Sequence, residues 1–204
     1  MKLKEIVWND SSKKAFLDYL VTHGNYEKQA WTRKILNTQL DVLAVPTKTM
    51  HTMASEIYRG DYAAFLSLKL YDCYECIALN GMIISKIKDF DEMVGYLKEY
   101  TKVMENWAHC DLLTFTIAAE NEARFRELAV EFIQSTRVFE RRLGLFIHLH
   151  LIRNPTYVEV AFDVLITLED EEAYYCNYDG RLASIRMYYS LSRSVVKKVE
   201  CLVY

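Results

Sequence analysis

Glycine and proline are scarce in this chain, with 6 Gly and 2 Pro among 204 residues. Sandwiches and barrels need many turns, and turns draw heavily on these two residues. The scarcity therefore argues against an all-β fold and favours long helices joined by short connections. With 51% hydrophobic residues, the chain is long enough for one domain with a substantial core, and we expect a single domain over residues 1–204.

Long hydrophobic runs are also missing. No apolar stretch approaches the roughly 20 residues that cross a bilayer, and the N-terminus, Met-Lys-Leu-Lys-Glu, lacks the apolar segment of a signal peptide. We expect a soluble, cytoplasmic protein without a membrane partner. The five cysteines are odd in number and mostly lie in apolar-periodic stretches, which favours reduced thiols over a disulfide framework.

The patterns of several enzyme and metal-site classes are absent. There is no Gly-rich phosphate loop, serine nucleophile elbow or metalloprotease motif. Cys73 and Cys76 have the spacing of half a zinc or redox site, but no second Cys or His pair at ligand spacing accompanies them. Two buried helical cysteines are the favoured interpretation, and hydrogen-bonded or solvated histidines are favoured for His109, His148 and His150.

An excess of positive charge is missing too, since the formal net charge is −3. This counts against a nucleic-acid binder, which usually carries a basic surface. The charge is uneven, however: residues 1–60 hold nine Lys or Arg against six acids, while residues 159–179 hold seven acids and no base. Local basic patches therefore remain open. Lys28, Arg33, Lys34 and Lys48 are candidates to meet phosphates, and solvated surface charge is an equal alternative.

Apolar residues recur at helical spacing along the whole chain and predict about ten helices, with no strand pattern. Asp61, Asp89 and Asn121 are expected N-caps, and Pro46 and Pro155 fit first-turn positions. Stacked helix pairs in a curved α-solenoid are the favoured architecture of this all-α chain, with a helical bundle as the alternative. The predicted helices are 11–22, 26–37, 47–58, 61–71, 73–87, 90–106, 108–119, 121–135, 138–152 and 156–168.

The most informative segment is 106–111, Asn-Trp-Ala-His-Cys-Asp. Trp107 and Asp111 are four residues apart, so on a helix they share one face. Spacing alone favours a core tryptophan and a carboxylate that caps or forms an ion pair. Two other segments belong to the same argument: Phe-Glu-Arg-Arg-Leu-Gly at 139–144, and Asn-Thr-Gln at 37–39 followed by Leu-Ala-Val-Pro at 43–46.

Taken as an ordered set, these segments resemble the AlkD-type alkylpurine DNA glycosylases of the DNA alkylation repair family, over about residues 10–176. The resemblance implies HEAT-like repeats, a catalytic carboxylate at Asp111, an active-site aromatic at Trp107 and a DNA-contacting arginine at Arg142, with Arg141 beside it. It further implies an enzyme that acts on double-stranded alkylated DNA without metal or organic cofactor. We expect a monomer, although no sequence pattern specifies the oligomeric state. An N3- or N7-alkylated purine is cationic and leaves readily, so the enzyme must stabilise an oxocarbenium-like sugar, which a fixed carboxylate does.

One departure from the family is clear. A second active-site Trp is expected beyond residue 175, yet no Trp follows Trp107. Codons for Gly-Arg-Leu-Ala at 180–183, read one base later, can encode Val-Ala-Trp-Leu, which matches the family. A frameshift near residue 177 is our hypothesis, and ordinary divergence over 177–204 is the alternative. Two other functions stay open: a helical-repeat DNA-binding or scaffold protein without catalysis, and a protein-interaction solenoid.

Overall fold

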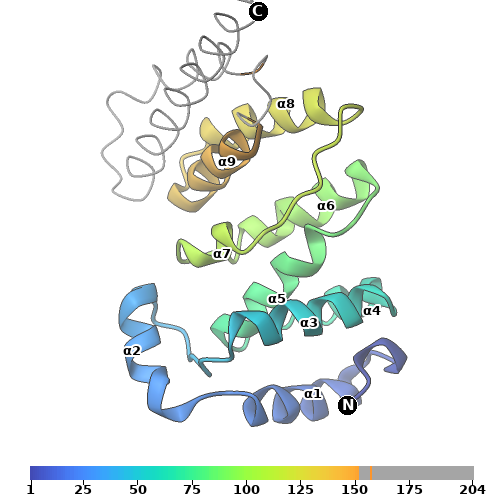
Figure 1. Cartoon of the computed structure of the whole chain (residues 1–204), viewed down its shortest axis with the longest axis vertical. Coiled ribbons are helices and arrows are strands. Elements are labelled where there is room, and N and C mark those ends of the chain that lie inside the picture. The colour runs from blue at the N-terminus through green and yellow to red at the C-terminus, as the bar shows by residue number, and fades with distance from the viewer. Residues whose placement is uncertain (152–156, 158–204) are drawn as a thin grey trace, which may run out of the picture. The chain divides into compact units, whose positions relative to one another are not determined.

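The computed structural model describes residues 1–151 and Tyr157. These residues form α-helices, one short 3-10 helix and connecting segments, with no strand in the described part, as the sequence predicted. They fall into two compact units, one over residues 1–116 and one that begins at Ile117 (Figure 1). None of the described helices is long and apolar enough to cross a membrane.

The first unit begins with the 3-10 helix η1 and holds seven of the α-helices. Their bounds are η1 (Leu3–Glu5), α1 (Asp10–Thr22), α2 (Tyr26–Leu36), α3 (Thr47–Tyr58), α4 (Tyr62–Ser67), α5 (Tyr74–Ile84), α6 (Phe90–Thr101) and α7 (Ala108–Asp111).

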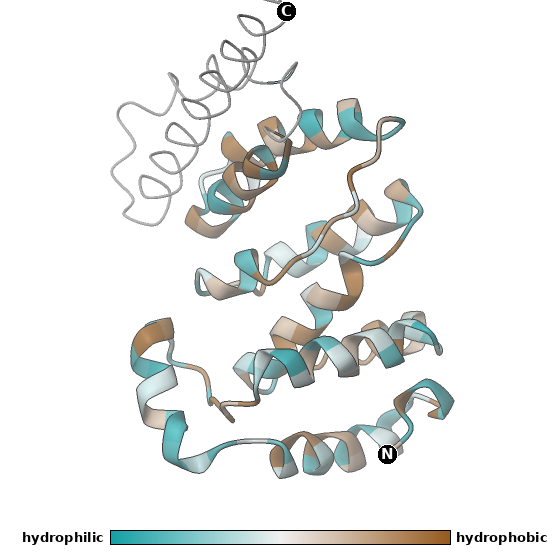
Figure 2. Cartoon of the chain, in the orientation of Figure 1, coloured by the Kyte–Doolittle hydropathy of each residue, from teal (hydrophilic) through white to brown (hydrophobic). Residues whose placement is uncertain are grey.

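Helix α5 is the centre of this unit. All of its residues are buried, and α3, α6 and α7 pack against it. The mostly brown colour of α5 in Figure 2 reflects the same composition. A helix that is apolar all round can form stably only if neighbours cover every face, so α5 fixes where the surrounding helices lie. A second cluster, Trp8, Phe16 and Phe65, packs edge to face with ring centroids 4.8–5.5 Å apart.

The described part of the second unit is an antiparallel helix pair, α8 (Glu122–Ile133) and α9 (Val138–Leu151). Gly144 permits their close approach, because a Cβ at this position would lie 2.6 Å from the Ala129 carbonyl oxygen and 2.8 Å from Cγ1 of Ile133. Tyr157 closes the end of this pair: its hydroxyl is 2.7 Å from Nδ1 of the buried His148.

Most predicted helices are confirmed to within a few residues, with three exceptions. The helices predicted at 61–71 and 90–106 end early, at Ser67 and Thr101. The helix predicted at 108–119 is wrong beyond Asp111, because residues 113–117 take an irregular, non-helical path. The helix predicted at 156–168 and Pro155 lie outside the described residues.

The predicted caps are also partly confirmed. Asp61 and Asp89 cap α4 and α6 by accepting hydrogen bonds from Ala64 N and Glu92 N. Asn121 is not a side-chain cap of α8, because its Oδ1 accepts from Ala118 N instead. Pro46 stands at the N-cap of α3, one position ahead of the predicted first turn.

Candidate active site

The segment 106–111 forms a single helical turn with a defined cap. The buried Asn106 side chain accepts hydrogen bonds from Ala108 N (3.1 Å) and His109 N (3.3 Å). The Asp111 backbone N–H then donates to the Trp107 carbonyl oxygen at 3.2 Å. The spacing of four residues is therefore realised as one turn, and Trp107 and Asp111 stand on the same side of it.

The Trp107 indole is tied to a segment far away in sequence. Its Nε1 donates to the Ile35 carbonyl oxygen at 3.3 Å, near the C-terminal end of α2. The side chain is only partly buried. One edge of the ring is thus used to hold its orientation while part of the indole remains accessible, an arrangement suited to contact with a planar ligand.

Asp111 is also partly exposed and lies near the first residue of α5, Tyr74. Burial raises the pKa of the Tyr74 phenol, and the negative charges of Glu75 and Asp111 raise it further. The Tyr74 ring stacks on the His109 imidazole, with centroids 5.2 Å apart and planes 22° apart. A carboxylate that reaches solvent on one side is therefore backed by a neutral phenol and an imidazole.

His109 is fully buried between these groups. Burial lowers its pKa to about 4, although the Tyr74 backbone carbonyl opposes part of that shift. Its Nδ1 accepts from Glu105 N at 3.3 Å, and its carbonyl oxygen accepts from the Tyr100 hydroxyl at 2.9 Å. The imidazole is neutral at pH 7 and serves as a packing element, in agreement with the hydrogen-bonded histidine favoured from the sequence.

A buried carboxylate organises the segment that leads from α2 to α3. Glu75, wholly buried in the first turn of α5, accepts hydrogen bonds from Leu43 N (3.0 Å) and Val45 N (3.3 Å). The residue between them, Ala44, has a left-handed backbone with φ 56°. Earlier in the segment, the Thr38 hydroxyl donates to the Glu105 carboxylate, just ahead of the site turn. The segments 37–39 and 43–46 thus converge on the base of the candidate site.

Tyr74 and Glu75 were not among the residues selected from the sequence. A usable signal exists for Glu75, because a lone acid within the otherwise apolar start of α5 must find partners when buried. Nothing local points to Tyr74 or to the Ile35 carbonyl, whose roles depend on segments brought together by the fold. Cys73 and Cys76, on either side of this pair, are both buried as expected, with Sγ atoms 3.3 Å apart.

Three basic residues of the first unit that were predicted to contact phosphates differ in their surroundings. Arg33 pairs with Asp41 at 2.8 Å, so part of its charge is already neutralised. Lys34, in the last turn of α2, and Lys48, in the first turn of α3, are exposed. The structure does not gather these three cations into one cluster on a single helix face.

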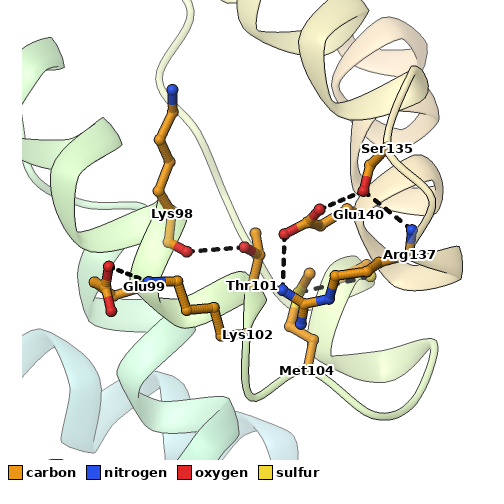
Figure 3. Close-up of polar contacts among 9 residues, drawn as sticks. Lys98, Glu99, Thr101, Lys102, Met104, Ser135, Arg137 and Glu140 are labelled. Carbon is orange, nitrogen blue, oxygen red and sulfur yellow. Dashed lines mark hydrogen bonds and ion pairs between the residues drawn. The ribbon is translucent and has the colours of Figure 1, made fainter.

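Arg141 and Arg142 belong to α9 in the second unit. The turn before α9 is ordered by its own side chains, since Ser135 contacts both Glu140 and the Arg137 backbone N–H, and Arg137 pairs with Glu140 at 3.0 Å (Figure 3). Arg141 donates to the carbonyl oxygens of Ser135 and Thr136. Arg142 is only 4% exposed, so contact with a phosphate requires its guanidinium to become accessible.

No group of three or more His, Cys, Asp or Glu side chains in the described part of the chain is arranged to hold a metal ion. The accessible functional groups of the candidate site are the Asp111 carboxylate and the Trp107 indole, which are both partly exposed. Such a pair can stabilise positive charge on a bound ligand through Coulombic and cation–π attraction.

No curated protein and no solved structure is significantly similar to the chain. The family model described as DNA alkylation repair enzyme matches residues 17–174. That range covers most of the chain and includes Trp107, Asp111, Arg141 and Arg142, as well as the segment 37–46. The chain therefore belongs to the DNA alkylation repair enzyme family.

Proposed function

We propose that this protein is a DNA N-glycosylase that removes cationic N3- or N7-alkylpurines from duplex DNA and leaves an abasic site. In this reaction the bond between the base and C1′ breaks, the purine departs as a neutral base with the bonding electrons, and water adds to C1′ and releases a proton to solvent. Because alkylation already makes the purine a good leaving group, the main demand on the enzyme is to stabilise the cationic sugar.

The observation that carries the proposal is the one-turn arrangement of Trp107 and Asp111. Asp111 supplies a fixed negative charge for the oxocarbenium-like sugar and an acceptor for the attacking water. Trp107 offers its ring face to the cationic nucleotide, an attraction worth about 0.5–2 kcal/mol depending on desolvation. Both side chains are partly exposed, which suits a reaction at the protein surface, tolerant of bulky alkyl groups.

The family resemblance adds HEAT-like repeats in a curved solenoid and phosphate contacts from Arg142 and the neighbouring Arg141. Local basic charge adds phosphate contacts from Arg33, Lys34 and Lys48. We further propose a single domain and a monomeric state. A bidentate guanidinium contact positions a phosphate more firmly than an ammonium does. Membership of a DNA alkylation repair family supports DNA as the partner.

Release of methylated purines from a methylated duplex tests the proposal. Asp111→Asn keeps the shape of the side chain and removes its charge, and we expect excision to fall by at least about 100-fold, the loss typical of removing one electrostatic stabiliser. Asp18→Asn, the same change at an exposed position of α1, is the matched control and should leave excision unchanged. Full activity of Asp111→Asn would refute the assigned role.

The second candidate is a family member that binds DNA without excising bases. The absence of any Trp after Trp107 favours it, because a second aromatic wall of the site is then missing. Duplex binding by the wild-type protein with no base release under any condition would support this candidate over the glycosylase.

A further inference from the structure

Helix α2 is almost unpacked. Of its 11 residues only Leu36, the last, is buried. Three large apolar side chains face solvent instead: Tyr26 is 88% exposed, Trp31 64% and Ile35 46%. In Figure 1 the helix stands at the margin of its unit, joined to α1 and α3 by non-helical segments.

Such a helix needs support, because isolated helices shorter than about 12–15 residues are marginal in water. Local devices hold α2 at its ends: Asn25 caps the first turn, and Asn37 adopts a left-handed C-cap. Arg33 pairs with Asp41, and the Ile35 carbonyl oxygen accepts the Trp107 indole N–H. None of these contacts covers Trp31, so its ring is held out on an ordered helix without a packing partner in the described part of the chain.

The charges on α2 indicate what covers this face. Lys28 and Lys34 lie three residues before and after Trp31, so all three point to one side of the helix. Both lysines are exposed, and no acidic partner is found for either among the described residues. Arg33 is two residues from Trp31, faces away, and is already paired. The only acid on the helix is Glu27, in the first turn, where the helix dipole favours it.

An aromatic ring between two unpaired ammonium groups is the composition of a surface that contacts nucleic acid. Along the helix axis Lys28 and Lys34 are separated by about 9 Å, at 1.5 Å per residue. Phosphates follow one another at about 3.4 Å of axial rise per strand, so the flexible lysine side chains can reach phosphates on both sides of a nucleotide that contacts the ring.

We propose that Lys28, Trp31 and Lys34, here called the α2 ridge, form a second DNA-binding surface beside the candidate active site. The two lysines contact phosphates, and the Trp31 indole packs on the sugar and base edge between them. The inference rests on the proposed function, since it assigns the same partner, duplex DNA. Because the C-terminal end of α2 is hydrogen bonded to Trp107, the ridge positions the duplex relative to Asp111.

The test measures binding of a labelled unmodified duplex by fluorescence anisotropy over a series of salt concentrations. Trp31→Ala should weaken binding about tenfold at every salt concentration, because the variant loses the apolar contact that the indole makes on the duplex. Lys28→Gln with Lys34→Gln should lower the slope of log K against log salt by about 1.8, close to 0.9 per phosphate contact. Val21→Ala, exposed on α1, and Lys14→Gln are the matched controls and should bind as the wild type does.

Excision assays separate this inference from the proposed function. Trp31→Ala should recover full excision when the protein is in large excess, whereas Asp111→Asn should bind normally and excise poorly. If Trp31→Ala binds DNA weakly and the wild type excises no base, the α2 ridge is supported as a DNA-binding surface and the proposed glycosylase function is refuted. Wild-type excision with unchanged binding by Trp31→Ala overturns the ridge alone. A shift of the protein from dimer to monomer on Trp31→Ala, with DNA binding intact, also overturns it and assigns the face to self-association.

Discussion

Acidification should destabilise this protein well above the pH at which carboxylates titrate, and His109 supplies a calculable part of the effect. Burial lowers the pKa of this histidine from 6.5 to about 4. In the unfolded chain it binds a proton near pH 6.5, while in the folded chain it stays neutral. Between pH 6.5 and pH 4 the unfolded chain therefore binds more protons than the folded chain. The free energy of unfolding is highest above pH 6.5 and decreases as the pH falls towards 4.

Between pH 7 and pH 5 this difference amounts to about 2 kcal/mol for one such histidine. His148 in the second unit is buried in the same way, and its pKa is also lowered to about 4, so it contributes a similar amount. The sum is a large part of the 5–15 kcal/mol that stabilises a typical domain. Tyr74 beside His109 and Tyr157 beside His148 remain neutral phenols between pH 5 and pH 7. They therefore supply no negative charge that would stabilise a protonated histidine.

Urea denaturation followed by circular dichroism at half-unit intervals from pH 5 to pH 7 measures the effect. The His109→Gln variant retains an acceptor for the Glu105 amide and removes the titrating group. Its free energy of unfolding should depend less on pH than that of the wild type, by about 2 kcal/mol over this interval. His51→Gln, the same change at a partly exposed position, is the control. An unaltered pH dependence in His109→Gln would refute the argument from burial.

Two further predictions concern packing between helices. Gly144→Ala should lower the free energy of unfolding by about 1–3 kcal/mol, because the added Cβ meets the α8 backbone. Gly95→Ala has nothing within 4 Å of the added Cβ and should raise the free energy of unfolding by up to about 1 kcal/mol. Thermal denaturation of both variants measures these changes. Glu75→Gln should cost about 1–3 kcal/mol, since an amide NH₂ would face the Leu43 or Val45 N–H, and faster hydrogen exchange at these two amides is the diagnostic result.

The extent to which the fold follows from sequence varies with how local the determining contacts are. Helix α3 matches its predicted bounds, 47–58, and α1, α2 and α9 begin or end within a residue of theirs. These helices carry their own start and stop signals. The prediction fails after Asp111. Apolar residues still recur at helical spacing there, but the backbone is not helical. Leu113 and Phe115 are buried while Thr114 and Thr116 are exposed, an alternation typical of extended backbone.

Two causes act together in that segment. Threonine, phenylalanine and isoleucine lose side-chain freedom in a helix, so the intrinsic preference for helix is weak. A contact from a distant segment then decides the outcome, because the Thr114 N–H donates to the Ser85 hydroxyl at 3.1 Å. Such a hydrogen bond between residues far apart in sequence leaves no periodic trace in either segment.

The residues of the candidate site show the same contrast between local signals and contacts from distant segments. Trp107 and Asp111 were selected because the short segment 106–111 resembles a family motif, whereas their spacing alone favoured a core tryptophan and a carboxylate that caps or forms an ion pair. Glu75 and Tyr74 were missed because their functions depend on the convergence of α5 with the segments 37–46 and 105–111. The motif therefore suggested the two accessible groups of the candidate site, and the structure adds the buried groups that pack behind them.

Helix α2 shows a different limit of sequence patterns. Tryptophan and isoleucine four residues apart, as Trp31 and Ile35 are, normally indicate a face that packs into a core. The periodicity of a helix specifies which side chains share a face, but it does not specify what covers that face. In this protein the described part of the chain leaves it open and places unpaired lysines on both sides of the indole. An apolar stripe with such flanks is better explained by a charged polymer as its partner than by the protein's own interior, and this is why the ridge is assigned to DNA.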